Sequence, residues 1–221
     1  LAVLISAAAA SLCPADAAQA AGDAVAAAPR ATISELGVDD ETRSFIDFWF
    51  DPIARDKLAS LAVAIRNSDP VVRDVLWCAF SRLIITKTLG ASRARDVSHS
   101  RPHIVRDEAS IDPIERFSAS VSEVLRKRAG FDAVQRDHLT LLRGDARALP
   151  LADGQVGAIV TSPPYLTAID YLRGHRLSLV WMGYSIARLR DLRGQNIGSE
   201  RGAPRPEHLR QAFAVAVQGE V

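Results

Sequence analysis

In the first half of the chain the hydrophobic positions recur every three or four residues, which is the period of an amphipathic helix. Leu58, Leu61 and Ile65 fall on one face in this way. Asp69 and Pro70 then stand in the order of a helix cap and a first helical residue, and a wide apolar face follows them. The pattern predicts two successive helices, of which the second is buried.

The first thirty residues are rich in alanine. The stretch "LAVLISAAAASL" predicts a helix, and the residues after it read as an Ala-rich connector. The same stretch could pass for the apolar core of a secretory signal, but no basic residue precedes Arg30, as the leader of such a signal would require. We therefore expect a helix and a connector over residues 1–30.

Residues 86–108 contain Gly, Ser and Pro with few apolar side chains, which predicts a loop. A further helix is expected from Asp112, with Pro113 in its first turn and Gly130 at its end. The basic residues of the loop could contact a nucleic-acid backbone, although a solvated surface explains them equally well. They are Lys87, Arg93, Arg95, Arg101 and Arg106.

After Gly130 the pattern changes from helical to extended. "HLTLLRGDARALP" predicts a strand that ends at Gly144 and Asp145, and "QVGAIVTSPPY" predicts a second strand that ends at Ser162. Two apolar strands among helices favour an α/β domain with a largely parallel sheet. Ligands of such sheets bind beyond the carboxyl ends of the strands, so the polar residues at both ends would line a site.

The residues after the second strand form a rigid polar group. Pro163 and Pro164 hold the chain extended, since proline restricts its own backbone and that of the residue before it. Ser162 adds a hydroxyl, and Tyr165 adds a flat ring for stacking. This arrangement suits a planar ligand that carries an amino group, and a nucleobase fits that description.

The sequence "TSPPY" is similar to the catalytic motif of the amino-group DNA methyltransferases, which use S-adenosylmethionine to methylate cytosine N4 or adenine N6. Residues 144–184, "FWFDP" and "SHSRPH" also resemble a group of DNA methylases, so that the resemblance covers most of residues 48–184. It implies catalytic roles for Ser162, Pro163, Pro164 and Tyr165. It also implies that Asp145 and Ala146 contact the cofactor.

The resemblance implies a partial Rossmann-like, class I S-adenosylmethionine-dependent methyltransferase fold with a helical insertion. Residues 1–30 would be the truncated start of this domain, residues 31–130 the helical region with the basic loop, and residues 131–221 the catalytic α/β segment. The family's glycine-rich cofactor turn is not found in the 221 residues. We therefore expect an internal fragment of a longer enzyme that binds S-adenosylmethionine weakly by itself.

The implied chemistry gives each motif residue a task. Ser162 and the Pro163 carbonyl would accept hydrogen bonds from the exocyclic amine, and Tyr165 would stack on a base flipped out of the duplex. Serine before the prolines favours cytosine N4 as the methylated atom. The resemblance also implies a role in a restriction-modification system. Adenine N6 of DNA, guanine N2 of RNA and a non-catalytic nucleic-acid-binding remnant remain as alternatives.

Composition narrows the class of protein further. With 27 basic and 26 acidic residues and 48% hydrophobic residues, the chain predicts one globular core without strong net charge. No apolar run is long enough to span a bilayer. Two cysteines, Cys13 and Cys78, are too few for a disulfide framework, so a cytoplasmic setting is expected.

Two further readings have weaker support. His99 and His103 have the spacing of metal ligands on one helix, but Pro102 disfavours that helix, so we expect no metal. A serine hydrolase could be built from Ser185, Asp191 and His208, but the second glycine of a nucleophile elbow does not follow Ser185.

Overall fold

The computed structural model describes residues 2–11, 13–85, 89–95, 103–128, 139–142, 144, 148–161 and 172–195. Its elements are α1 (Ala2–Ala10), α2 (Ala15–Ala26), the 3-10 helix η1 (Ile33–Leu36), α3 (Asp40–Trp49), α4 (Pro52–Arg66), α5 (Pro70–Ile84), α6 (Pro113–Arg128), α8 (Leu172–Leu179) and α9 (Ile186–Gln195).

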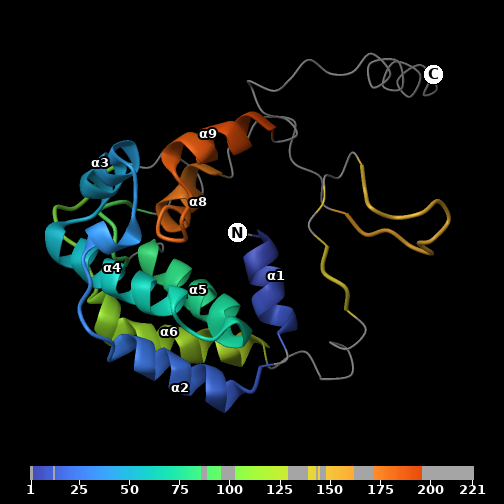
Figure 1. Ribbon diagram of the computed structural model, residues 1–221, viewed down its shortest axis with the longest axis horizontal. Coiled ribbons are helices and arrows are strands. Elements are labelled where there is room, and N and C mark those ends of the chain that lie inside the picture. Colours follow the sequence, from blue (N-terminus) through green and yellow to red (C-terminus); the bar gives the residue numbers. More distant parts are fainter. Residues whose placement is uncertain are drawn as a thin grey trace.

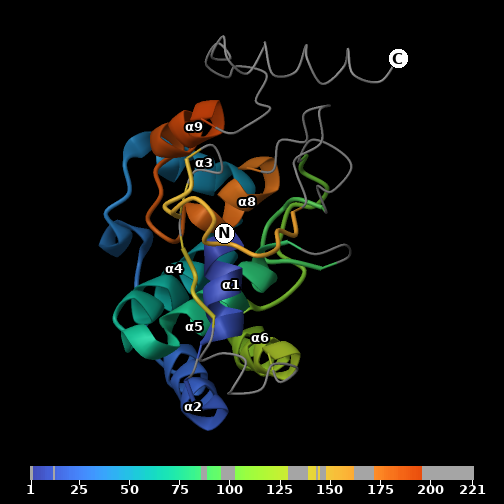
Figure 2. The same ribbon diagram turned by 90° about the vertical axis from the view of Figure 1, so that its right-hand side faces the viewer.

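Helix α5 is the centre of a helical bundle (Figure 1). It contacts α1, α2, α4 and α6, and α2 also packs along α6. Helix α8 joins the bundle through α5, while α9 lies against α8 and α3. In the view turned by 90°, α3, α8 and α9 lie together at one end of the bundle (Figure 2).

Two aspartates cap successive helices of this bundle, and the second of them is the cap that the sequence predicts before Pro70. The side chain of Asp51 accepts a hydrogen bond from the N–H of Ala54, and that of Asp69 accepts one from Val71. Each is followed by a proline in the first turn. The helices predicted around residues 58–65 and from Pro70 are confirmed, because their capping signals are local.

The core contains a cluster of aromatic rings from segments far apart in the sequence. Trp181 is fully buried and meets the ring of Phe50 edge to face, with 5.1 Å between centroids. It also contacts Phe80 of α5, at 6.2 Å between centroids. The turn between α8 and α9 is thus anchored in the same core as α5.

Helix α2 corrects the expectation of a connector after the first helix. Ala15–Ala26 is a regular helix whose small residues allow close packing against α6. Gly22 shows how close this packing is, because a Cβ there would lie 2.9 Å from Cγ2 of Val121.

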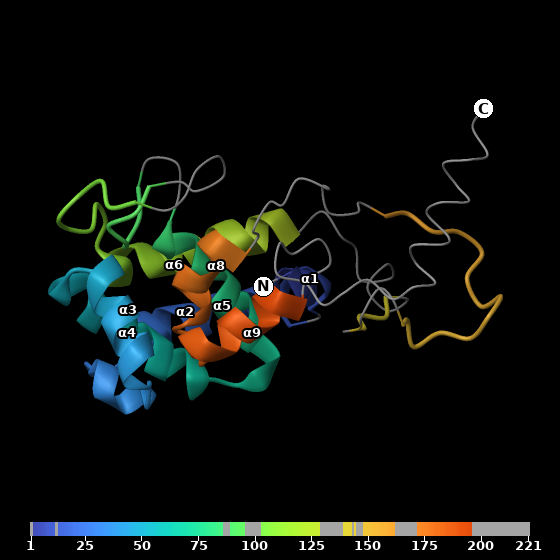
Figure 3. The same cartoon turned by 90° about the horizontal axis from the view of Figure 1, so that it is seen from above.

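The expected α/β, Rossmann-like fold is wrong for the described part of the chain. Of these residues 62% are helical and 2% are strand, and no sheet forms among them. The run before the proline motif, predicted as a buried strand, is irregular there, with Ile159 80% and Val160 101% exposed. Residues 148–161 extend away from the helices (Figures 1 and 3). An apolar run becomes a stable strand only with neighbouring strands to pair with, and the helical bundle offers none.

Among the described residues, no helix combines the length and the apolar character that crossing a bilayer requires.

Candidate nucleic-acid interface

The residues that the sequence assigns to catalysis and to the cofactor lie outside the part of the chain that the structure describes. They are Ser162, Pro163, Pro164, Tyr165, Asp145 and Ala146. Their mutual arrangement therefore stays a prediction.

The basic loop is described in part. Lys87 and Arg101 fall outside the described residues, and Arg93, Arg95 and Arg106 are placed. These three side chains lie in different surroundings, and only one of them is exposed without a hydrogen-bond partner among the described residues.

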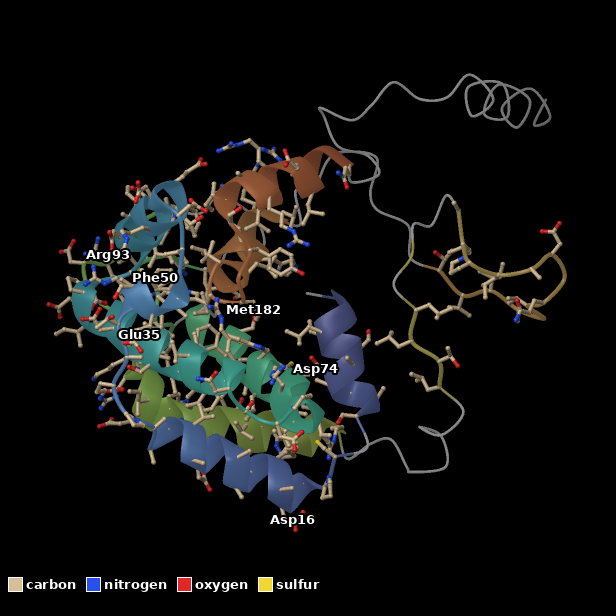
Figure 4. The ribbon with its side chains drawn as sticks, in the orientation of Figure 1. Asp16, Glu35, Phe50, Asp74, Arg93 and Met182 are labelled. Carbon is tan, nitrogen blue, oxygen red and sulfur yellow. The ribbon has the colours of Figure 1, made fainter. Side chains whose placement is uncertain are left out.

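Arg93 fastens the loop to the end of α3. Its backbone N–H donates to the carbonyl of Trp49 at 2.8 Å. Its Nε donates to the carbonyl of Asp107 at 2.9 Å, and Nη1 lies 3.5 Å from the carbonyl of Phe48. Figure 4 shows Arg93 beside Phe50 at this end of the bundle. The guanidinium is thus committed to backbone carbonyls, which indicates a structural role.

Asp51, the acidic residue of "FWFDP", ties the same loop to α4. It is 5% exposed, its Oδ1 caps α4 at Ala54, and its Oδ2 accepts the N–H of Ala109 at 2.8 Å. Both carboxylate oxygens are therefore occupied by backbone donors. The aspartate organises the loop, and this accounts for its place in the motif without any contact to a ligand.

Ser110 closes the loop onto Gly90. Its Oγ accepts the N–H of Gly90 at 2.9 Å, and its own N–H donates to the Gly90 carbonyl at 3.1 Å. Arg106 donates to the same hydroxyl from Nη1. Ala94 and Ile104 pair as an isolated antiparallel bridge nearby. The described residues on the two sides of the loop are therefore joined by hydrogen bonds.

Arg95 is exposed and has no hydrogen bond or ion pair among the described residues. Of the three described loop arginines it is the one whose guanidinium is available to a phosphate. The predicted nucleic-acid-binding loop therefore keeps one described candidate, while Arg93 and Arg106 hold the loop together.

Helices α8 and α9 carry a basic surface that the sequence reading passed over. Residues 172–195 contain five arginines and one acidic residue, Asp191. The guanidinium of Arg188 lies over the ring of Tyr184, 5.0 Å from its centroid. Arg190 forms an ion pair with Glu41 of α3. The repeated arginines between residues 188 and 193 were the available signal.

Ser185, proposed above as a possible nucleophile, begins α9. Its Oγ accepts the N–H of Arg188 at 3.2 Å, and its carbonyl accepts the N–H of Leu189 at 3.0 Å. It follows a turn and not a strand, so it does not form a nucleophile elbow. Ser185 is a helix cap, and His208 lies outside the described residues.

Helix α3 holds the acidic counterpart of this surface. Hydrogen bonds from Thr42, first from its backbone N–H, lower the pKa of Asp39, which caps α3. The Thr42 hydroxyl also accepts the N–H of Ile186 at 3.0 Å, so the starts of α3 and α9 are joined.

Comparison of the chain with protein-family models, with curated proteins and with solved structures found no match.

Proposed function

We propose that this chain acts in S-adenosylmethionine-dependent methylation of an exocyclic amino group in DNA, with cytosine N4 as the favoured target. One observation carries the proposal: "TSPPY" at residues 161–165, directly after the apolar run "GAIV". A serine, two rigid prolines and an aromatic ring in this order suit a flipped base and its amino group.

Each motif residue has a task at the base. The Ser162 hydroxyl and the Pro163 carbonyl accept hydrogen bonds from the N–H groups of the amine, which orients its lone pair for attack on a methyl donor. The Tyr165 ring stacks on the base and offsets part of the cost of unstacking it, at about 1 to 3 kcal/mol per base.

The residues that the resemblance assigns to S-adenosylmethionine, Asp145 and Ala146, lie outside the described part of the chain. The proposal for this chain therefore concerns the hold on the base.

A non-catalytic nucleic-acid-binding role is the second candidate. The helical body favours it, because the described part of the chain forms no sheet at whose edge a methyltransferase motif would sit. Under this alternative the basic residues bind nucleic acid and no methyl group is transferred.

The gene that encodes this chain is expressed in a host without DNA methylation, and DNA and RNA are digested to nucleosides for mass spectrometry. N4-methylcytosine that disappears in Ser162→Ala, and persists in the exposed control Ser34→Ala, supports the proposal. N6-methyladenine alone contradicts the base assignment. N2-methylguanine in RNA contradicts the substrate class, and unmodified nucleosides favour the non-catalytic role.

A further inference from the structure

Charge is distributed unevenly over the described helices. Residues 13–75 contain eleven acidic and six basic residues, whereas residues 172–195 contain five arginines and a single aspartate. The chain as a whole has a formal net charge of only +1. The helix pair α8–α9, called the hairpin below, therefore has a net positive charge in a nearly neutral protein, and a polyanion is the class of partner that such a surface attracts.

Within this hairpin, Arg188 and Arg190 differ in how their charge is compensated. Both are exposed on α9, two residues apart. Arg190 is bound to Glu41, with 60% of the Arg190 side chain and 50% of the Glu41 side chain exposed. Arg188 forms no ion pair with any described residue and lies over Tyr184 instead. The uncompensated charge of the pair is at Arg188.

The platform under Arg188 is fixed to the bundle. The N–H of Tyr184 donates to the carbonyl of Leu179 at 3.2 Å, and the turn before it contains the fully buried Trp181. Met182 in the same turn lies between the hairpin and the bundle (Figure 4). Since the ring is held in place, the guanidinium that stacks on it loses less entropy when it binds a ligand.

The hairpin follows the proline motif closely in the sequence. Leu172, the first residue of α8, comes seven positions after Tyr165. A chain of this length spans at most about 25 Å when fully extended. A helical turn of B-DNA is about 34 Å long, so a base held at Tyr165 and a phosphate at the start of α8 can belong to the same duplex turn.

We propose that Arg188, positioned by Tyr184, contacts a backbone phosphate of the duplex DNA that carries the target base. The inference rests on the proposed function and adds to it a contact surface outside the proline motif. A guanidinium presents several N–H donors in a plane that matches phosphate oxygens, and stacking on an aromatic ring leaves its edge free. Such a contact sets the position of the duplex without reading its sequence.

The test measures binding of the full chain to a fluorescent duplex by anisotropy, without cofactor, between about 50 and 200 mM salt. Arg188→Gln should weaken binding several-fold and reduce the slope of log affinity against log salt by about 0.9, the value for one phosphate contact. Arg190→Gln is the matched control on the same helix. It should change both quantities by less than half as much, because Glu41 already compensates that charge.

Tyr184→Ala separates the position of the guanidinium from its charge. The charge of Arg188 remains in this variant, so affinity should fall while the salt slope stays near that of the wild type. Thermal unfolding by circular dichroism checks that the variants are folded. Arg188→Lys should retain most of the slope and lose part of the affinity.

Equal losses for Arg188→Gln and Arg190→Gln would overturn the inference, as would binding to anionic vesicles without binding to the duplex. If the chain methylates DNA but Arg188→Gln binds the duplex as tightly as the wild type, the Arg188 contact is contradicted and the proposed function is not. If binding of the duplex depends on Arg188 but no methylation is found, the Arg188 contact is supported and the proposed enzymatic function is contradicted.

Discussion

The close approach of α2 and α6 makes Gly22→Ala a sharp test of the bundle. A Cβ at Gly22 would lie 2.9 Å from Cγ2 of Val121 and 3.3 Å from its Cβ and Cγ1. Alanine gains about 1 kcal/mol of helix propensity over glycine. Overpacking of a core costs about 1 to 3 kcal/mol, so the free energy of unfolding should fall by up to about 2 kcal/mol.

Val121→Ala removes the methyl groups that the new Cβ would meet. By itself it should cost about 1 to 2 kcal/mol, since Val121 is fully buried. In the double variant the Cβ added by Gly22→Ala occupies part of the vacated space. We expect the double variant to be about 1 to 2 kcal/mol more stable than the sum of the two single changes predicts.

Urea unfolding followed by circular dichroism gives the four free energies of the cycle. Gly194→Ala in α9 is the matched control, because a Cβ there meets no atom within 4 Å and should stabilise by up to about 1 kcal/mol. Additive effects of Gly22→Ala and Val121→Ala, within about 0.5 kcal/mol, would refute the packing of α2 on α6.

Three further predictions concern the loop, the pH dependence and the motif. Asp51→Ala should destabilise the protein by about 2 to 3 kcal/mol and speed amide exchange in residues 89–110, since two backbone donors lose their acceptor; slow exchange there would contradict its role as an anchor. The hydrogen bond from Arg82 lowers the pKa of Glu123 from its ordinary value, so its ionised form stabilises the fold above that ordinary value and the contribution is lost as pH falls through the lowered pKa. Glu123→Gln should therefore lower the melting temperature at pH 7, and this difference should shrink as acid protonates the carboxylate; a difference that does not change with pH would disprove the ion pair. Ser162→Ala should slow methyl transfer, whereas Tyr165→Ala should also weaken capture of a flipped base, so that Tyr165→Ala is more harmful on duplex than on single-stranded substrate; equal effects on the two substrates would count against flipping.

Local sequence signals identified α1, α4, α5 and α6 correctly, whereas the residues of α2 were expected to be a connector. Asp51 and Asp69 each precede a proline, and apolar residues recur at helical spacing after both. The helix expected from Asp112 is present as α6. Capping bonds and helical spacing involve residues within a few positions of each other, so a reading of the chain alone can find them.

Local sequence patterns predict the structure wrongly where it depends on pairing between distant segments. Apolar runs such as "GAIV" are compatible with a buried strand, but a strand needs neighbours, and residues 156–161 have none among the described residues. In the same way the sequence shows Arg93 only as a basic loop residue, whereas the structure shows that its guanidinium donates to the backbone carbonyls of Phe48 and Asp107.

The sequence by itself identified the helices α1, α4, α5 and α6 and the residues that are candidates to hold a nucleobase, because both follow from side-chain chemistry and local backbone preference. Only the tertiary structure decided that Trp181 lies in the core with Phe50, and that α2 packs on α6 at Gly22. It also showed that Arg190 is paired with Glu41, a residue 149 positions away, while Arg188 is not. Contacts of this kind depend on the summed packing of many segments, and no local pattern encodes them.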